Sequence, residues 1–145
     1  MSKILYTAHA KAIGGRNGYA KTNDDVLKLD LASPGAPNAK PGSTNPEQLF
    51  ACGYAACFGS ALEAAGKQHN IATTDAQVQA DVSLYKDDSG FFISVALNVS
   101  LPGIATKDAS KLVEAAHQIC PYSKATRGNI EVTLRVNDQP LEMAA

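Results

Sequence analysis

The stretch that decides the fold is Asn45-Pro-Glu-Gln-Leu-Phe-Ala-Cys-Gly-Tyr-Ala-Ala-Cys-Phe58. Asn45 suits the N-cap of a helix, Pro46 suits the first helical position, and Gln48 follows three residues after the cap, as in a capping box. The residues that follow carry no charge and include two thiols. The pattern predicts a helix that runs to about Lys67 and is apolar nearly all round in its first half.

Length and charge limit the classes of protein that this chain can form. Its 145 residues, 45% of them hydrophobic, suffice for a single globular domain over residues 1–145. Its 13 basic and 14 acidic residues give a net charge of −1, which argues against nucleic acid or an anionic membrane as a partner. The N-terminal segment lacks a signal-peptide core, and no continuous apolar run reaches the length of a membrane span. We therefore expect a soluble, cytoplasmic protein.

Strand-like and helix-like segments follow one another in an α+β order. A second helix is expected to open at Thr106 or Lys107 and to stop at Pro121, and a hairpin turn is expected at residues 87–90. Glycine-rich and proline-rich loops are expected at residues 14–18 and 33–44. The strand-like runs are Ile4–Ala10, Val26–Leu31, Ala76–Lys86, Phe91–Leu101 and Ile130–Val136. Strands at both ends of the chain with helices between them predict an α+β fold rather than a doubly wound parallel sheet.

The apolar first helix has a consequence for quaternary structure. A helix that is apolar on every side is typical of one buried on every side, and a small sheet can cover only one of its faces. In so short a chain the simplest source of a second layer is another copy of the protein. We therefore predict an obligate, intertwined homodimer.

Cys57 is either inert packing or a hidden nucleophile. Deep in an apolar helix, the low dielectric disfavours the thiolate and raises the pKa of the thiol, and the helix N-terminus is too far away for its dipole to help. Buried free cysteines are most often packing residues, so a reactive thiol here needs a cation from elsewhere in the chain. Cys52 lies about 140° round the helix from Cys57. The two thiols cannot readily pair, and we interpret Cys52 as packing.

Arg16 is the candidate cation. Its flanking glycines let the backbone turn tightly and bring the guanidinium into a cleft, although an arginine in such a turn is by itself more often solvated. Glu47, in the first helical turn, suits the helix dipole and can also hold an arginine fork through two bonds. Glu47 and Cys57 are about 15 Å apart along a continuous helix. Either the helix breaks near Gly53, or the Arg16–Glu47 pair serves the thiol of a partner subunit, which the predicted dimer favours.

Cys120 lies in Ile119-Cys-Pro-Tyr-Ser123, at the corner where Pro121 stops the second helix. A cysteine at a corner is expected to be more mobile and accessible than one within a helix, as a resolving thiol requires, and a partly buried surface cysteine is the alternative. His117 and Cys120 could form a Cys/His nucleophilic pair, or both could be metal ligands. A lone HxxC lacks the other ligands of a metal site, so we expect no bound metal.

Three motifs together resemble the organic hydroperoxide resistance (Ohr) branch of the Ohr/OsmC superfamily. They are the glycine-flanked Arg16, the run from Asn45 to Phe58, and Cys120-Pro-Tyr-Ser-Lys-Ala-Thr-Arg-Gly-Asn-Ile130. The likeness covers nearly the whole chain, and three motifs in the right order are far more specific than one cysteine. Two features depart from the family pattern: Cys52 stands where alanine is expected, and the loop at residues 33–44 is rich in proline rather than glycine.

The resemblance implies a thiol peroxidase built as an intertwined α+β dimer, with antiparallel-rich sheets around a buried central helix and two active sites at the subunit interface. It implies that Cys57 is the peroxidatic cysteine, that Cys120 is the resolving cysteine, and that Arg16 and Glu47 activate the thiolate. No metal, haem or flavin is implied. The implied reductant is a lipoyl dithiol carried on a partner protein.

The expected substrates are alkyl and fatty-acid hydroperoxides. Burying a methylene is worth about 0.8 kcal/mol, so an apolar cleft beside the thiol would favour them over hydrogen peroxide. The residues expected to line this cleft are Phe50, Tyr54, Phe58, Ile119 and Tyr122, with Phe91 or Phe92. Two other classes stay open: a cysteine hydrolase, which would need His9, His69 or His117 beside the thiol, and a non-enzymatic dimer that binds apolar ligands.

Overall fold

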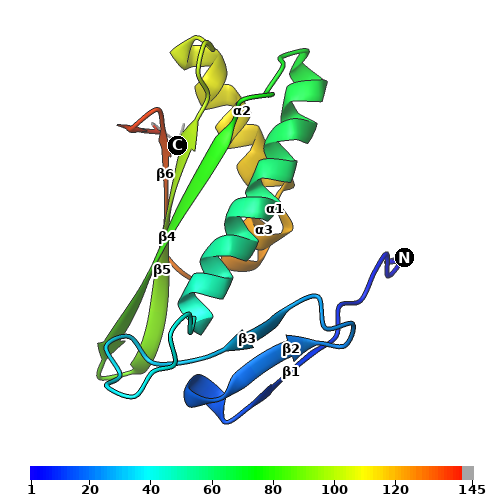
Figure 1. Cartoon of the computed structure of the whole chain (residues 1–145). Coiled ribbons are helices and arrows are strands. Elements are labelled where there is room, and N and C mark those ends of the chain that lie inside the picture. Colours follow the sequence, from blue (N-terminus) through cyan, green and yellow to red (C-terminus); the bar gives the residue numbers. More distant parts are fainter. Residues whose placement is uncertain (142–145) are drawn as a thin grey trace. The chain divides into compact units, whose positions relative to one another are not determined.

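The structure is a computed structural model that describes residues 1–141 of the chain. It comprises two compact units, the first from Met1 to Leu49 and the second from Phe50 onward. Over residues 1–141 the units contain two sheets and three α-helices (Figure 1). The predicted α+β class is confirmed. The single domain over residues 1–145 and the homodimer stay predictions.

The first unit is a small antiparallel sheet with the order β1-β2-β3. Its central strand is half-buried, its outer strands are largely exposed, and Leu31 is the one fully buried residue of the unit. Its elements are β1 (Ala10–Ile13), the 3₁₀ helix η1 (Gly15–Asn17), β2 (Tyr19–Thr22) and β3 (Lys28–Asp30). A sheet of three short strands without a buried face is only marginally stable by itself.

Two glycines make the tight turn that was expected around Arg16. Gly14 adopts a φ of +78°, a conformation that favours glycine. At Gly18 a Cβ atom would lie 1.6 Å from the carbonyl oxygen of Ile13, so no side chain fits there. The turn fixes the register in which Ile13 faces Tyr19.

The strand predictions for this unit are partly wrong. Ile4–Ala10 does not form a strand before its last residue, and Val26–Leu31 contains a strand only over Lys28–Asp30. Strand β2 was missed, because its residues follow the predicted turn directly and do not alternate clearly. Strand-like composition is not enough without a partner, and here the turn at Gly14–Gly18 decides which residues pair. Residues 33–44 form no strand, as predicted, apart from a single bridge between Leu31 and Thr44.

Helix α1 (Pro46–His69) is continuous and two residues longer than predicted. The side-chain oxygen of Asn45 accepts a bond from the backbone N–H of Gln48 at 2.9 Å, which confirms the N-cap. The reciprocal bond of a capping box is absent from this helix start, because the Oε1 atom of Gln48 instead accepts a bond from Thr44 at 2.6 Å. By length and composition alone α1 could cross a membrane, a test that core helices of soluble proteins also pass.

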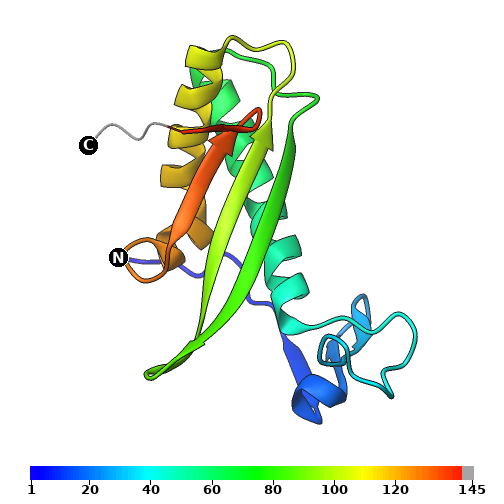
Figure 2. The ribbon, with the colours of Figure 1, turned by 90° about the vertical axis from the view of Figure 1, so that its left-hand side faces the viewer.

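The second unit is a four-stranded sheet with helices on one face. Strands β4 and β5 form the predicted antiparallel hairpin, β5 pairs with β6 in parallel, and β7 closes the edge. Figure 2 shows the long helices behind this sheet, on the same side. The elements after α1 are β4 (Gln77–Asp87), β5 (Gly90–Ser100), α2 (Thr106–Ile119), α3 (Pro121–Thr126), β6 (Val132–Val136) and β7 (Gln139–Pro140).

Helix α3 was not predicted. Pro121 ends α2, as expected, but it also occupies the first position of a new six-residue helix. Cys120 is the hinge residue between the two helices, with a φ of −64° and a ψ of 121°. The core that these elements enclose is apolar apart from His117 and a few hydroxyls, and its largest fully buried side chains are Tyr54, Phe58, Leu62, Leu97, Leu101 and Leu112.

Candidate functional site

The first unit joins Arg16 to Glu47 by two charged hydrogen bonds. Nη1 of Arg16 donates to one carboxylate oxygen of Glu47 at 2.8 Å, and Nη2 donates to the other at 2.5 Å. This is the bidentate fork that the sequence suggested. The Arg16 side chain remains 42% exposed, against 16% for Glu47. The guanidinium is therefore fixed in direction and still open to a further partner.

The fork keeps both groups charged. The bonds from Arg16 are the main reason that the pKa of Glu47 lies below its usual range. The same bonds raise the pKa of Arg16 further above its already high value. The pair is thus a permanent ion pair at neutral pH, built on the η1 turn and on the first turn of α1.

The second unit brings Cys57 and Cys120 together. Their sulfur atoms lie 3.6 Å apart, although the residues are 63 positions apart in the chain. Cys57 is partly buried and Cys120 is fully buried. The expectation that Cys120 is the accessible thiol is wrong, because α3 follows it directly and the residue packs into the core. A disulfide needs an S–S distance of about 2.05 Å, so the sulfurs need approach by only about 1.5 Å.

The environment of Cys57 disfavours its thiolate. Burial is the main cause that raises the pKa of this thiol, and the neighbouring Cys120 raises it further. The backbone N–H of Tyr122, which lies near the sulfur, acts in the opposite direction and lowers the pKa of this thiol. A reactive thiolate at Cys57 therefore needs an additional positive charge.

The continuity of α1 rules out one of the two ways in which Arg16 was expected to supply that charge, namely a break of the helix near Gly53. The helix does not break near Gly53, so Glu47 and Cys57 are separated by ten residues of unbroken helix, about 15 Å along its axis. A single arginine fork that holds Glu47 cannot also reach a thiol so far along the same helix. That the fork serves a thiol on another subunit stays a prediction.

The five residues expected to contact substrate differ in how accessible they are. Tyr122 and Ile119 are 40% and 39% exposed, and Phe50 is partly buried. Tyr54 and Phe58 have no exposed surface, so they lie behind any surface that a substrate can reach in this structure. The rings of Phe50, Tyr54 and Tyr122 form one cluster, with centroids 5.7 to 6.1 Å apart. A substrate-binding role stays a prediction for all five.

Cys52 does not contribute packing within the chain. Its side chain is exposed, on a side of α1 that faces away from the core, so that interpretation is wrong for this structure. None of the side-chain hydrogen bonds within residues 1–141 joins Cys57 to a histidine. His117 is buried with its Nδ1 unpaired among the described residues. No contact therefore favours a cysteine hydrolase.

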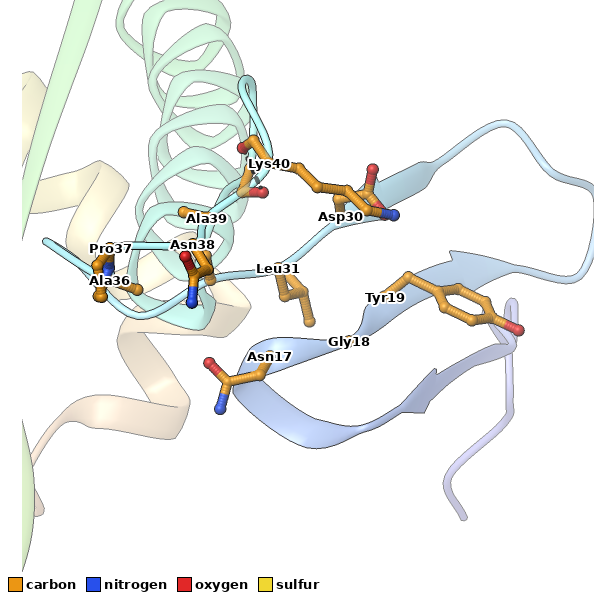
Figure 3. Close-up of a pocket in the computed structure, with 12 residues that line it drawn as sticks. Asn17, Gly18, Tyr19, Asp30, Leu31, Ala36, Pro37, Asn38, Ala39 and Lys40 are labelled. Atoms are coloured by element: carbon orange, nitrogen blue, oxygen red, sulfur yellow. Dashed lines mark hydrogen bonds and ion pairs between the residues drawn. The ribbon is translucent and has the colours of Figure 1, made fainter.

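The first unit also has a cavity of about 490 Å³ beneath the loop at residues 33–44 (Figure 3). Lys40 lies across its rim, with its Nζ 3.6 Å from a carboxylate oxygen of Asp30. Both side chains are largely exposed, so this ion pair contributes little. None of the predicted catalytic residues lines the cavity, although Asn17 follows Arg16 directly.

Known proteins similar to this chain agree on one family. Residues 38–135 match the family model described as OsmC-like protein. The organic hydroperoxide resistance protein OhrA of Bacillus subtilis is 49% identical over 140 residues, which cover 94% of this chain and 99% of that protein.

Solved structures give the same result. The crystal structure of OhrB of Bacillus subtilis superposes with a TM-score of 0.87 at 49% identity, covering 92% of this chain and all of that one. An organic hydroperoxide resistance protein of Elizabethkingia anophelis superposes with a TM-score of 0.85 at 44% identity, covering 93% of this chain and 98% of the other.

Proposed function

The chain belongs to the OsmC-like family, with organic hydroperoxide resistance proteins among its relatives, and on that premise we propose that it is a cysteine-based peroxidase that reduces organic hydroperoxides to alcohols. The observation that carries the proposal is the 3.6 Å separation of Cys57 and Cys120. One of these thiols is partly open and the other is enclosed. That asymmetry suits a partly exposed thiol that attacks the peroxide and a buried thiol that afterwards reacts with the sulfenic acid.

The reaction proceeds in three steps. The Cys57 thiolate attacks one oxygen of the hydroperoxide, the O–O bond breaks, and the alkoxide leaves as an alcohol after taking up a proton, so that Cys57 becomes a sulfenic acid. The Cys120 thiol then displaces the sulfenic hydroxyl, which leaves as water, and a disulfide forms. An external dithiol, a lipoyl group on a partner protein, reduces the disulfide by exchange.

The Arg16–Glu47 pair supplies the missing charge in this proposal. Because α1 is unbroken, the pair activates Cys57 of a second copy, so the active site forms at a subunit interface. The guanidinium stabilises the thiolate and then the departing alkoxide. Two features of the first unit support a second copy: its sheet encloses only Leu31, and Ile4, Leu5 and Tyr6 are each more than 80% exposed. A concentration-independent monomer mass in solution would contradict the dimer.

The apolar surroundings account for the proposed preference for alkyl and fatty-acid substrates. Tyr122 and Ile119 offer apolar surface near Cys120, and Phe50 packs against the Tyr122 ring. Burial of a substrate chain against such side chains favours organic hydroperoxides over hydrogen peroxide by about 0.8 kcal/mol per methylene. Equal kcat/KM values for the two kinds of peroxide would count against this pocket. We place the protein in the cytoplasm, where a reducing environment keeps its thiols free.

One experiment tests the proposed chemistry directly. Reduced protein is mixed with cumene hydroperoxide and its products are mapped by peptide mass spectrometry. A Cys57–Cys120 disulfide should form in the wild type and in Cys52→Ser, and no disulfide should form in Cys57→Ser. Cys120→Ser should stop at a sulfenic acid on Cys57, which a dione reagent traps. Thiols that stay unchanged in the wild type would overturn the peroxidase.

A further inference from the structure

Three buried hydroxyl groups lie on α1 and α3, the helices that flank the thiol pair, and have no part in the chemistry proposed above. The phenol oxygen of Tyr54 is 2.8 Å from Oγ of Ser123 and 3.1 Å from Oγ1 of Thr126. Tyr54 and Ser123 have no exposed surface, and Thr126 is 5% exposed. Burying hydroxyls in an apolar core is costly unless they form hydrogen bonds. We therefore expect this cluster to have a specific structural role.

The cluster satisfies its own hydrogen bonds in a single arrangement. Thr126 Oγ1 donates its one proton to the backbone carbonyl of Ser123 at 3.2 Å. The Tyr54 hydroxyl must then donate to Thr126, and Ser123 must donate to Tyr54, because each hydroxyl has one proton. Every hydroxyl donates once, and the bonds run in one direction from the Ser123 hydroxyl through Tyr54 and Thr126 to the backbone carbonyl of Ser123. Such a network is directional, so it specifies one position of α3 against α1 more sharply than apolar contacts would.

Helix α3 needs such an anchor. It has only six residues, and its N-cap makes no side-chain hydrogen bond. A helix of this length is not stable by itself. The Tyr122 ring also contacts α1, and it lies over Gly53 so closely that a Cβ there would be 3.0 Å from the phenol oxygen.

The hydroxyl contact and the thiol contact share one register. Tyr54 and Cys57 are three residues apart on α1, which places them on one face of the helix. Their partners, Ser123 and Cys120, are also three residues apart, in the reverse direction along the chain. The bond between Tyr54 and Ser123 therefore holds α3 in the register that brings Cys120 to Cys57 and the Tyr122 backbone N–H to the same sulfur.

We propose that Tyr54, bonded to Ser123 and Thr126, is a positioning residue for disulfide closure, because it fixes α3 so that Cys120 meets the sulfenic acid of Cys57. This inference rests on the proposed function. It concerns the second step alone: the Cys120 sulfur forms a bond to the Cys57 sulfur, and the sulfenic oxygen leaves as water. Attack on the peroxide precedes this step and does not need the Cys120 sulfur.

The test separates the two steps in Tyr54→Phe, which keeps the ring and removes the hydroxyl. In Tyr54→Phe, disulfide closure should slow by roughly tenfold, since two buried hydrogen bonds are lost, and the sulfenic acid should accumulate. Stopped-flow measurement of Thr126→Val, a change outside the predicted substrate contacts, should show peroxide-dependent sulfenic acid formation within about twofold of wild type. Thr126→Val should slow closure similarly, and Thr126→Ser, which keeps the hydroxyl, should restore it.

A second measurement does not depend on peroxidase activity. Equilibration with glutathione redox buffers gives the effective concentration of Cys120 at Cys57, which should fall by roughly tenfold in Tyr54→Phe. Tyr85→Phe is the matched control, because it removes a tyrosine hydroxyl that lies 3.4 Å from Ser94 on the exposed side of the hairpin. Val136→Ala controls for general loss of stability, since it opens the core at β6.

The outcomes distinguish this inference from the function on which it rests. Wild-type closure and an unchanged glutathione equilibrium in Tyr54→Phe, with sulfenic acid still formed, would overturn the positioning role and leave the peroxidase intact. An equal slowing in Val136→Ala would overturn it too, because instability alone would then explain the effect. Absence of any sulfenic acid in wild type would instead overturn the proposed function.

Discussion

The Arg16–Glu47 pair and the Cys57–Cys120 pair each join distant parts of the chain, and they are built in opposite ways. The first is charged, partly open to solvent through Arg16, and held by a glycine-dependent turn. The second is uncharged, lies within the core, and is held by packing and by buried hydroxyls. Each has what the other lacks: an open positive charge on one side, and on the other a thiol whose burial raises its pKa. In the proposed dimer, the chemistry starts only when the two regions meet.

Arg16→Lys should break that complementarity most severely. Lysine keeps the charge but cannot hold both carboxylate oxygens and a thiolate in one planar fork. We expect kcat/KM for cumene hydroperoxide to fall by about a hundredfold, comparable to loss of one oxyanion donor. Lys21→Gln, which removes a cation that bonds Asp25 in the same unit, should leave the rate unchanged. Wild-type rates in Arg16→Lys would show that a point charge is enough.

Gly18→Ala should weaken the first region alone. The added Cβ meets the Ile13 carbonyl oxygen, so the turn that carries Arg16 must shift. We expect kcat/KM to fall by roughly tenfold and the free energy of unfolding to fall by about 2 kcal/mol, as for other steric clashes. Gly35→Ala has no neighbour within 4 Å of its new Cβ but a φ of +75°, and should cost only about 1 kcal/mol without changing the rate. Equal effects of both variants on kcat/KM would show that the turn at Gly18 has no specific role in positioning Arg16.

His117 should give the second region a pH dependence that the first lacks. Burial, and then the charge of Arg127, lowers the pKa of His117 below its ordinary value. The unfolded chain therefore takes up a proton more readily than the folded one, so stability is full above about pH 6.5 and falls as the pH drops below it. Urea unfolding of wild type between pH 7.5 and 5.5 should show this slope. His117→Gln should flatten the slope and His9→Gln, a change at an exposed residue, should keep it; a slope that persists in His117→Gln would exclude His117 as its cause.

Cys52→Ser should have the smallest effect. The side chain is exposed and lies about 140° round the helix from Cys57, so the peroxidase rate should stay within about twofold of wild type and the free energy of unfolding within about 0.5 kcal/mol. Loss of the dimer or of activity would show that Cys52 lies in a subunit interface near the site.

Much of the architecture could be predicted from local patterns. The N-cap at Asn45, the hairpin around Asp87 to Gly90 and the second helix up to Pro121 all depend on residues close together in sequence, and the structure has them within one or two residues. Strand β2 and helix α3 were missed, because a short strand needs its partner and a six-residue helix needs its anchors. The prediction that Cys120 is accessible was wrong for the same reason. The corner before Pro121 was expected to lie at the surface, but packing against distant residues buries it.

The sequence by itself determined the chemistry that is available: one thiol in an apolar helix, one thiol beside a proline, and one arginine between glycines. These features depend on residue type and on neighbours a few positions away. Only the tertiary structure decided which groups meet, namely that Arg16 grips Glu47 through both carboxylate oxygens and that Cys120 lies 3.6 Å from Cys57. It also revealed the hydrogen bonds that join Tyr54 to Ser123 and Thr126, which no sequence pattern indicated. Contacts over 31 to 72 positions arise from packing and topology, and no local pattern encodes them.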